Sequence, residues 1–174
     1  AVAGVAAIAR QARGVRAAAS QPDMPVRFDV PAGACDCHTH IFGDARRFPF
    51  AANRVYTPES ASVEEMRALH RALHMDRVVI VQPSVYGTDN ACTLDAVRRI
   101  GARARAVAVI DDTTSASALD EMHNAGVRGI RLNLATSGQT DPAVALRRVQ
   151  KAVEQFFSGT ATTEIYTGLS VVEA

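Results

Sequence analysis

The chain has 174 residues, of which 48% are hydrophobic and 21% are charged, and its formal net charge at pH 7 is +1. This composition is typical of one globular domain, and the near-zero charge gives no support for a nucleic-acid partner. No apolar run approaches the roughly 20 residues of a membrane-spanning helix, so no membrane partner is expected. The three cysteines do not have the pattern of a disulfide framework.

Residues 1–30 differ from the rest because they are rich in alanine and arginine and end in a linker that contains proline. Three alanines at 17–19 resemble the cleavage site of an export signal, but arginines interrupt the apolar region that such a signal needs. We interpret residues 1–30 as a flexible arm or the remnant of an export signal, and residues 31–174 as the folded part. The protein is expected in the cytoplasm under the first interpretation and in the periplasm under the second.

The sequence Ala-Cys-Asp-Cys-His-Thr-His at residues 34–40 lies just after a glycine and predicts a short buried strand. Side chains alternate along a strand, so Asp36, His38 and His40 are expected on one face. Two imidazoles on one face can bind one divalent ion or polarise one carbonyl group. The alternative is that both histidines only form hydrogen bonds with neighbouring loops.

The two cysteines of this segment, Cys35 and Cys37, are expected on the opposite face. That position separates the thiols from the imidazoles, which argues against a zinc site made of cysteine and histidine. We interpret both cysteines as small apolar residues buried under a layer of helices.

The chain after this strand alternates apolar runs, typical of strands buried on both faces, with amphipathic helical segments. The further strands are predicted at residues 77–82, 104–110, 127–134 and 163–167. Helices are predicted to begin at the capping pairs Ser62/Glu65, Ser117/Asp120 and Asp141/Pro142, and another is predicted to end at Gly101. In the last helix, Leu146, Val149 and Val153 form the expected apolar stripe, with basic residues outside. This alternation predicts a mostly parallel sheet with right-handed crossovers.

Polar residues gather where the predicted strands give way to loops. They are His38, His40, Ser84, Asp111, Arg131, Asn133 and Tyr166. In barrels and in doubly wound sheets, the carboxyl ends of the strands form the edge where ligands bind. We therefore expect these side chains to form one site.

Taken together, these motifs resemble the amidohydrolase-2 group, and within it the 2-pyrone-4,6-dicarboxylate lactonases. The motifs are Cys-Asp-Cys-His-Thr-His at 35–40, Tyr-Thr-Pro at 56–58, Val-Gln-Pro-Ser at 81–84, Gly-Thr-Asp-Asn at 87–90, Val-Arg-Gly-Ile-Arg-Leu-Asn at 127–133 and Ile-Tyr-Thr at 165–167. The resemblance implies the N-terminal part, about five βα units, of a TIM-like (β/α)8 barrel. It also implies a hydrolase that acts on a small substrate, a lactone or related carbonyl compound that carries carboxylates.

The same resemblance implies roles for individual residues. His38 and His40 match the pair on the first strand that polarises the scissile carbonyl, either through a divalent metal such as zinc or without one. The positions that hold the substrate and its carboxylates are matched by Tyr56, Ser84, Arg131 and Tyr166. An arginine suits a carboxylate because its planar fork can donate two hydrogen bonds.

Three features depart from the family pattern. Ser137 stands where these lactonases have another arginine, which weakens the expectation of a dicarboxylate. Residues 156–163 do not resemble the family, as a local change of reading frame would explain. The chain ends before the late strand whose aspartate activates water in the family. We therefore expect a truncated form with little activity, whose open barrel edges favour self-association.

Two other functions and one structural role of Arg131 remain open. The chain could be a non-catalytic half-barrel that pairs with another chain. It could also be a complete five-stranded doubly wound domain for a small ligand, although no glycine-rich phosphate loop follows any strand. Arg131 could pair with Asp111 or Asp112 in the barrel interior instead of binding a substrate.

Overall fold

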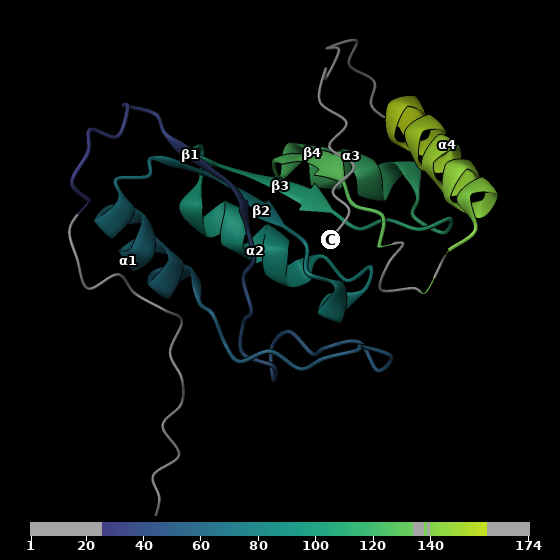
Figure 1. Ribbon diagram of the computed structural model, residues 1–174. Coiled ribbons are helices and arrows are strands. Elements are labelled where there is room, and N and C mark those ends of the chain that lie inside the picture. Colours follow the sequence, from purple (N-terminus) through teal and green to yellow (C-terminus); the bar gives the residue numbers. More distant parts are fainter. Residues whose placement is uncertain (1–25, 134–137, 139, 160–174) are drawn as a thin grey trace, which may run out of the picture.

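The computed structural model describes residues 26–133, 138 and 140–159, with side chains as far as residue 155. Within this part of the chain, strands alternate with helices (Figure 1). In chain order they are β1 (Cys35–Thr39), α1 (Val63–Leu73), β2 (Arg77–Val81), the 3-10 turn η1 (Ser84–Tyr86), α2 (Ala91–Ile100), β3 (Ala104–Ala108), α3 (Ala116–Asn124), β4 (Val127–Ile130) and α4 (Pro142–Gly159). Most of the predicted arm, the predicted fifth strand and the positions of Ser137 and Tyr166 lie outside the described residues.

The strands form one parallel sheet in the order β1-β2-β3-β4, which is also their order in the sequence. β1 pairs with β2 and with no other described strand, so it lies at an edge of the sheet as described. A doubly wound sheet would place the first strand between two others. The sheet order therefore confirms the predicted partial barrel. Among the described residues, no helix is long and apolar enough to cross a membrane.

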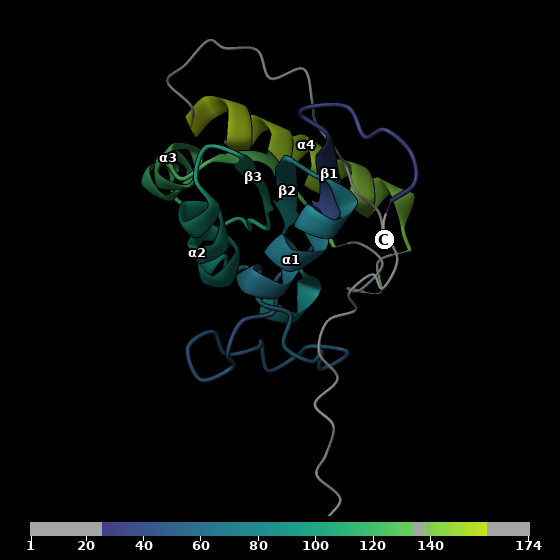
Figure 2. The same ribbon diagram turned by 90° about the vertical axis from the view of Figure 1, so that its left-hand side faces the viewer.

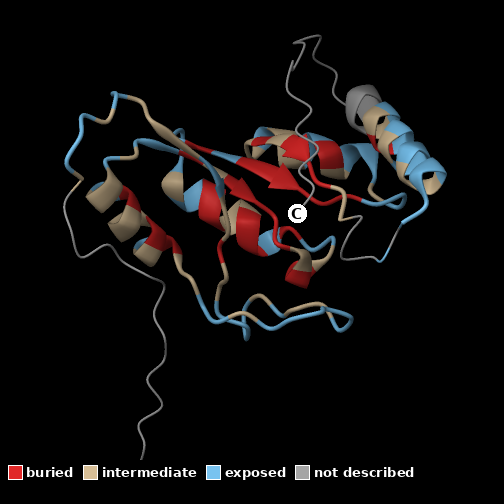
Figure 3. Cartoon of the chain, in the orientation of Figure 1, coloured by how far each residue is buried: buried red, intermediate tan, exposed pale blue. Residues whose placement is uncertain are grey.

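The main core lies between the sheet and the helices α1 and α2. Its buried side chains include Val63 and Met66 of α1, Val97 of α2, and Val78 and Ile80 of β2. A smaller cluster joins α3 and α4 to the ends of the last two strands; its members are Ile110, Leu119, Ile130 and Ala152. Figure 2 shows α1 and α2 together on one side of the sheet and α4 on another, and Figure 3 shows buried residues along β2, β3 and β4, whereas β1 is intermediate or exposed.

Capping residues begin the helices, mostly where the sequence predicts them. Ser62 and Glu65 form a complete capping box at α1. At α4, Asp141 accepts a hydrogen bond from the backbone of Ala143 over 2.8 Å. The predicted start of α3 was wrong by two residues, because Ser115 has the extended backbone of a cap and accepts from the amide of Ala118. Ser117 already lies in the first turn of that helix.

The orientation of α4 also differs from the predicted apolar stripe. Leu146 is 58% exposed, whereas Ala152 is buried against Ile110 and Leu119. Val149 and Val153 are half-buried. With Ala152 on the buried side of α4, Leu146 lies six residues earlier and therefore on another side of the helix.

Candidate active site

β1 contains an irregularity that changes which way its side chains point. Asp36 is the register partner of Val78, and Thr39 is the register partner of Ile80. Three steps along β1 therefore match two steps along β2, so β1 carries one extra residue. Such a bulge interrupts the alternation of side chains between the two faces of a sheet.

The face predicted for Asp36 and for the two cysteines was wrong. The Asp36 carboxylate points toward the helices, where its Oδ2 atom lies 2.9 Å from Nε2 of His70 on α1. Cys35 precedes the bulge and therefore faces away from α1, and Cys37 is exposed, so neither thiol is buried under the helices. Partial burial and the neighbouring Cys37 thiol raise the pKa of Cys35. A raised pKa argues against a reactive thiolate at Cys35.

His38 and His40 do lie together. Their ring centroids are 5.2 Å apart, and the rings meet edge to face at 82°. Nδ1 of His40 lies 2.8 Å from the carbonyl oxygen of Val81. A carbonyl only accepts, so Nδ1 carries the hydrogen and Nε2 carries the lone pair in the neutral ring. Two imidazoles thus share one face of β1, as predicted from the sequence.

The surroundings of His40 keep its ring neutral. Burial lowers the pKa of His40, and the positive charge of Arg131 and the His38 ring lower it further, against the opposing effect of the Val81 carbonyl. A neutral ring with its lone pair on Nε2 can accept a proton or coordinate a cation. It cannot donate a hydrogen bond from that atom.

Arg131 follows β4 and is 6% exposed. Its Nη1 atom donates to the carbonyl oxygen of Gln82 over 3.1 Å, but Nε is buried without a partner among the described residues. Burial lowers the pKa of Arg131, although an arginine keeps its charge at any physiological pH. A buried cation with an unused donor is costly unless a ligand completes its interactions.

The predicted alternative, an ion pair between Arg131 and an aspartate, is wrong for the part of the chain that is described. Asp112 pairs with Lys151 of α4 at 2.5 Å. Asp111 accepts from the hydroxyl of Thr113 at 2.7 Å. Both carboxylates are thus engaged elsewhere.

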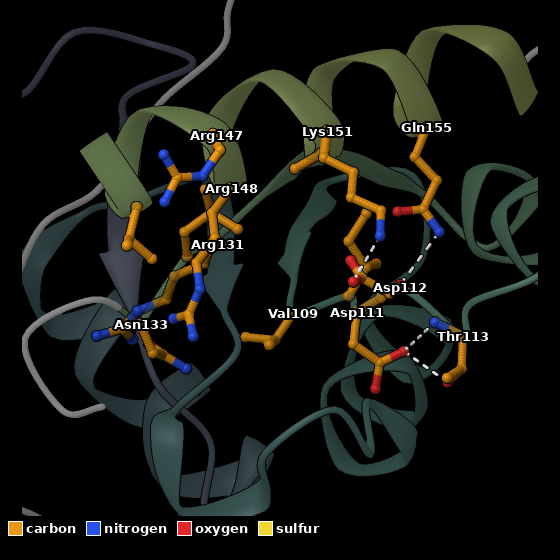
Figure 4. A pocket seen from close by; sticks show the side chains of 14 residues that line it. Val109, Asp111, Asp112, Thr113, Arg131, Asn133, Arg147, Arg148, Lys151 and Gln155 are labelled. Atoms are coloured by element: carbon orange, nitrogen blue, oxygen red, sulfur yellow. Dashed lines mark hydrogen bonds and ion pairs between the residues drawn. The ribbon is translucent and has the colours of Figure 1, made fainter. Parts of the chain in front are cut away.

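A cavity of about 620 Å³ opens between the carboxyl ends of β3 and β4 and one side of α4 (Figure 4). The labelled residues that line it are Val109, Asp111, Asp112, Thr113, Arg131, Asn133, Arg147, Arg148, Lys151 and Gln155. Arg131 and Asn133 gather at one end of it, and Oδ1 of Asn133 is also buried without a described partner. The same cavity thus has an unused buried donor and an unused buried acceptor.

The sequence did not indicate the contribution of α4 to this cavity. Arg147, Arg148 and Lys151 were predicted on the outer face of the helix, and all three are exposed. They nevertheless line the cavity, because α4 crosses above the strand ends rather than packing flat on the sheet. A run of basic residues on one helix side was the only available signal.

The other predicted site residues are placed less closely. Tyr56 is 44% exposed, and it lies near enough to Arg131 to raise the pKa of that guanidinium. Ser84 begins η1, separated by two residues from the end of β2, and its carbonyl oxygen accepts from the amide of Gly87 over 3.0 Å. Tyr166 lies outside the described residues. The arrangement therefore brings together His38 and His40, with Arg131 near enough to lower the pKa of His40. The two histidines are not among the residues that line the cavity.

The fit to a divalent metal can be judged from the donors present. His38 and His40 supply two imidazoles on a rigid strand, which suit zinc. In the described ranges, no group of three or more histidine, cysteine, aspartate or glutamate side chains could hold an ion. A metal bound by this pair would therefore need further ligands from beyond the described residues.

A family model described as amidohydrolase matches residues 35–158. The chain belongs to this family. Over 114 residues it is 43% identical to the 2-pyrone-4,6-dicarboxylate hydrolase of Comamonas testosteroni, covering 66% of this chain and 37% of that protein. Over 129 residues it is 38% identical to the 4-sulfomuconolactone hydrolase of Hydrogenophaga intermedia, covering 72% and 43%. The chain thus spans less than half the length of these relatives.

Solved structures agree with the fold. A protein from Acinetobacter baumannii, described as a 2-pyrone-4,6-dicarboxylic acid hydrolase with citric acid bound, matches with a TM-score of 0.62 and 28% identity. The match covers 73% of this chain and 46% of that protein. A similarly described protein from Pseudomonas putida matches with a TM-score of 0.61 and 32% identity, covering 74% of this chain and 46% of that one. The described residues therefore form the N-terminal part of a TIM-like amidohydrolase barrel.

Proposed function

We propose that this chain is the N-terminal part of a lactone hydrolase whose substrate carries at least one carboxylate. The observation that carries the proposal is the buried guanidinium of Arg131, which lacks an ion-pair partner among the described residues and keeps an unused Nε donor. It lies at a cavity on the ligand-binding edge of the sheet, close enough to His40 to lower the pKa of that ring. A carboxylate from a substrate would supply the missing charge.

The proposed roles follow from the chemistry of each group. Arg131 binds the carboxylate through its planar fork and orients the lactone, with Tyr56 and Ser84 on neighbouring loops. His40 presents a lone pair on Nε2, and His38 lies beside it. A divalent ion, where one binds to this pair, supplies a Lewis acid that polarises the lactone carbonyl. Without an ion, a protonated ring would be needed to donate to the developing oxyanion.

Three relatives support a carboxylated or otherwise anionic substrate. The Comamonas protein is named for a pyrone dicarboxylate, and the Hydrogenophaga protein for a sulfonated lactone. The Acinetobacter structure holds citric acid, which carries three carboxyl groups. A cavity with Arg131 at one end and Arg147 along its side suits such anions, whereas Lys151 is paired with Asp112 there.

Turnover is expected to need more of the barrel than the described strands. The eight strands of a closed barrel typically span about 250 residues, and the resemblance to the family implies a general base on a late strand. We propose that the chain binds the substrate weakly by itself and hydrolyses it slowly or not at all. The first test is therefore a binding measurement.

In this test, the 15N-labelled chain is titrated with 2-pyrone-4,6-dicarboxylate and with unsubstituted 2-pyrone, and amide shifts are followed by NMR. We expect only the dicarboxylate to shift signals of residues around Arg131. Arg131→Met should weaken its binding on the order of 10–100-fold, as for a lost hydrogen bond to a charged group. Arg98→Met, which removes an exposed arginine of α2, is the matched control. Equal binding of both pyrones, or unchanged binding by Arg131→Met, would refute the proposal.

A further inference from the structure

An aspartate–histidine pair, with His70 buried and Asp36 half-buried, lies behind β1, on the opposite side from the His38 and His40 rings. Oδ2 of Asp36 is 2.9 Å from Nε2 of His70. His70 is buried on the inner face of α1, one turn after Met66 and two turns after Val63. A carboxylate cannot donate, so the His70 ring donates to Asp36 in either of its charge states.

The second oxygen of the same carboxylate reaches back to the site. Oδ1 of Asp36 accepts a hydrogen bond from the backbone amide of His38 over 3.1 Å. This amide lies inside the bulge, between the register positions of Asp36 and Thr39. A bulge leaves its extra residue outside the ladder of hydrogen bonds between strands, so the carboxylate replaces the partner that the ladder would supply.

The bulge decides where His38 points. With strict alternation, His38 would share the face of Asp36 and point at the helices. With one extra residue after Asp36, His38 and His40 lie instead on the face opposite to Asp36, where their ring centroids are 5.2 Å apart. Whatever holds the bulge therefore holds the histidine pair on that face.

We infer that Asp36 and His70 are positioning residues for this pair. Asp36 fixes the amide of His38 in the bulge, and His70 fixes the Asp36 carboxylate to α1. Neither side chain contacts the cavity, so their effect on chemistry passes through the placement of His38. The inference uses the proposed function only for its consequence on turnover, because the geometry can be tested without a substrate.

The test measures the nuclear Overhauser effect between the ring protons of His40 and the protons of Val81, whose carbonyl oxygen lies 2.8 Å from Nδ1 of His40, in the full chain with chelator present to remove metal ions. This contact reports the face on which His40 lies, whereas the two imidazoles would stay neighbours on either face. In Asp36→Ala, we expect this cross-peak to disappear and the His38 amide signal to move. In Asp36→Asn, the side-chain oxygen still accepts from the amide, so the cross-peak should return. Met66→Ala is the matched control, since it weakens the packing of α1 without touching the carboxylate.

His70→Leu keeps the approximate volume of the side chain and removes the hydrogen-bond donor to Asp36. This variant therefore also tests the inference if Asp36→Ala does not fold. We expect a weaker cross-peak in His70→Leu, although the buried leucine preserves the helix packing. An unchanged cross-peak in both Asp36→Ala and His70→Leu would overturn the inference. Equal loss of the cross-peak in Met66→Ala would overturn it too, because the effect would then be general loosening.

A second readout separates this inference from the proposed function. In an active barrel-length enzyme, loss of such a supporting interaction typically lowers activity on the order of 10–100-fold. We expect Asp36→Ala to lower kcat to this extent with little change in KM, because Arg131 still binds the carboxylate. If no lactone is hydrolysed at all, the proposed function fails, whereas the cross-peak experiment still stands.

Discussion

The Nη1 atom of Arg131 donates to the carbonyl oxygen of Gln82, and Nε of the same side chain is buried without a described partner. A cation in this state destabilises the fold unless a ligand joins it. We therefore expect Arg131→Met to raise the free energy of unfolding by on the order of 1 kcal/mol, although it removes ligand binding. Urea denaturation of both proteins measures the difference. A structural role for Arg131 would instead make the variant less stable than the parent chain.

Asn90 joins the start of α2 to the end of β3. Its Nδ2 atom donates to the carbonyl oxygens of Val109 over 2.8 Å and Thr88 over 3.0 Å, and its Oδ1 accepts from the Val109 amide. In Asn90→Asp, a carboxylate oxygen would face two carbonyl oxygens in a buried place. We expect a loss of about 2 kcal/mol or more in the free energy of unfolding at neutral pH. Asn53→Asp, at an exposed position, should change stability by less than about 0.5 kcal/mol.

The structure and the sequence pattern place the cap of α3 at different serines. Ser115 is the cap in the structure, whereas the pattern favoured Ser117. We expect Ser115→Ala to lower the free energy of unfolding by about 1 kcal/mol, as for other lost helix caps. Ser117→Ala should lower it by a few tenths only, through its contact with the Ser115 hydroxyl. The reverse order of the two effects in thermal denaturation would place the cap at Ser117.

His40 gives a prediction on pH. Its pKa is lowered in the folded protein, chiefly by burial, so its ring should titrate below the ordinary value of 6.5. Between these two pKa values, the unfolded chain binds a proton that the folded chain does not. Stability is therefore expected to fall as the pH drops below 6.5. NMR of the ring proton in the presence of chelator measures the midpoint, and a midpoint above 6.5 would contradict the described environment.

Local signals explain why most of the fold could be predicted from the sequence. The capping box at Ser62 and the proline after Asp141 act on residues within one helical turn, so the sequence alone shows them. Apolar runs such as residues 77–82 likewise indicate strands without knowledge of their neighbours. These signals do not decide the order of the strands, because right-handed connections occur in barrels and in doubly wound sheets alike. The resemblance to the family was what predicted the sequential order.

The site could be predicted only in part, because its remaining features depend on contacts distant in the sequence. The bulge in β1 exists only relative to the register of β2, so it reversed the predicted faces of Asp36 and Cys37. The partner of Asp36 is His70, which lies 34 residues away. Similarly, the buried state of Arg131 and the cavity beside α4 depend on how that helix packs, through Ala152, on the strand ends.

The proposed roles of His38, His40 and Arg131 in opening a carboxylated lactone have one most direct test. This chain is joined to the carboxyl-terminal part of the Comamonas relative, and the rate of ring opening of 2-pyrone-4,6-dicarboxylate is measured. We expect turnover by the chimera, a loss on the order of 10²–10³ in kcat for His38→Ala and for His40→Ala, and a raised KM for Arg131→Met. An active chimera whose kcat and KM are unchanged by all three substitutions would contradict the account.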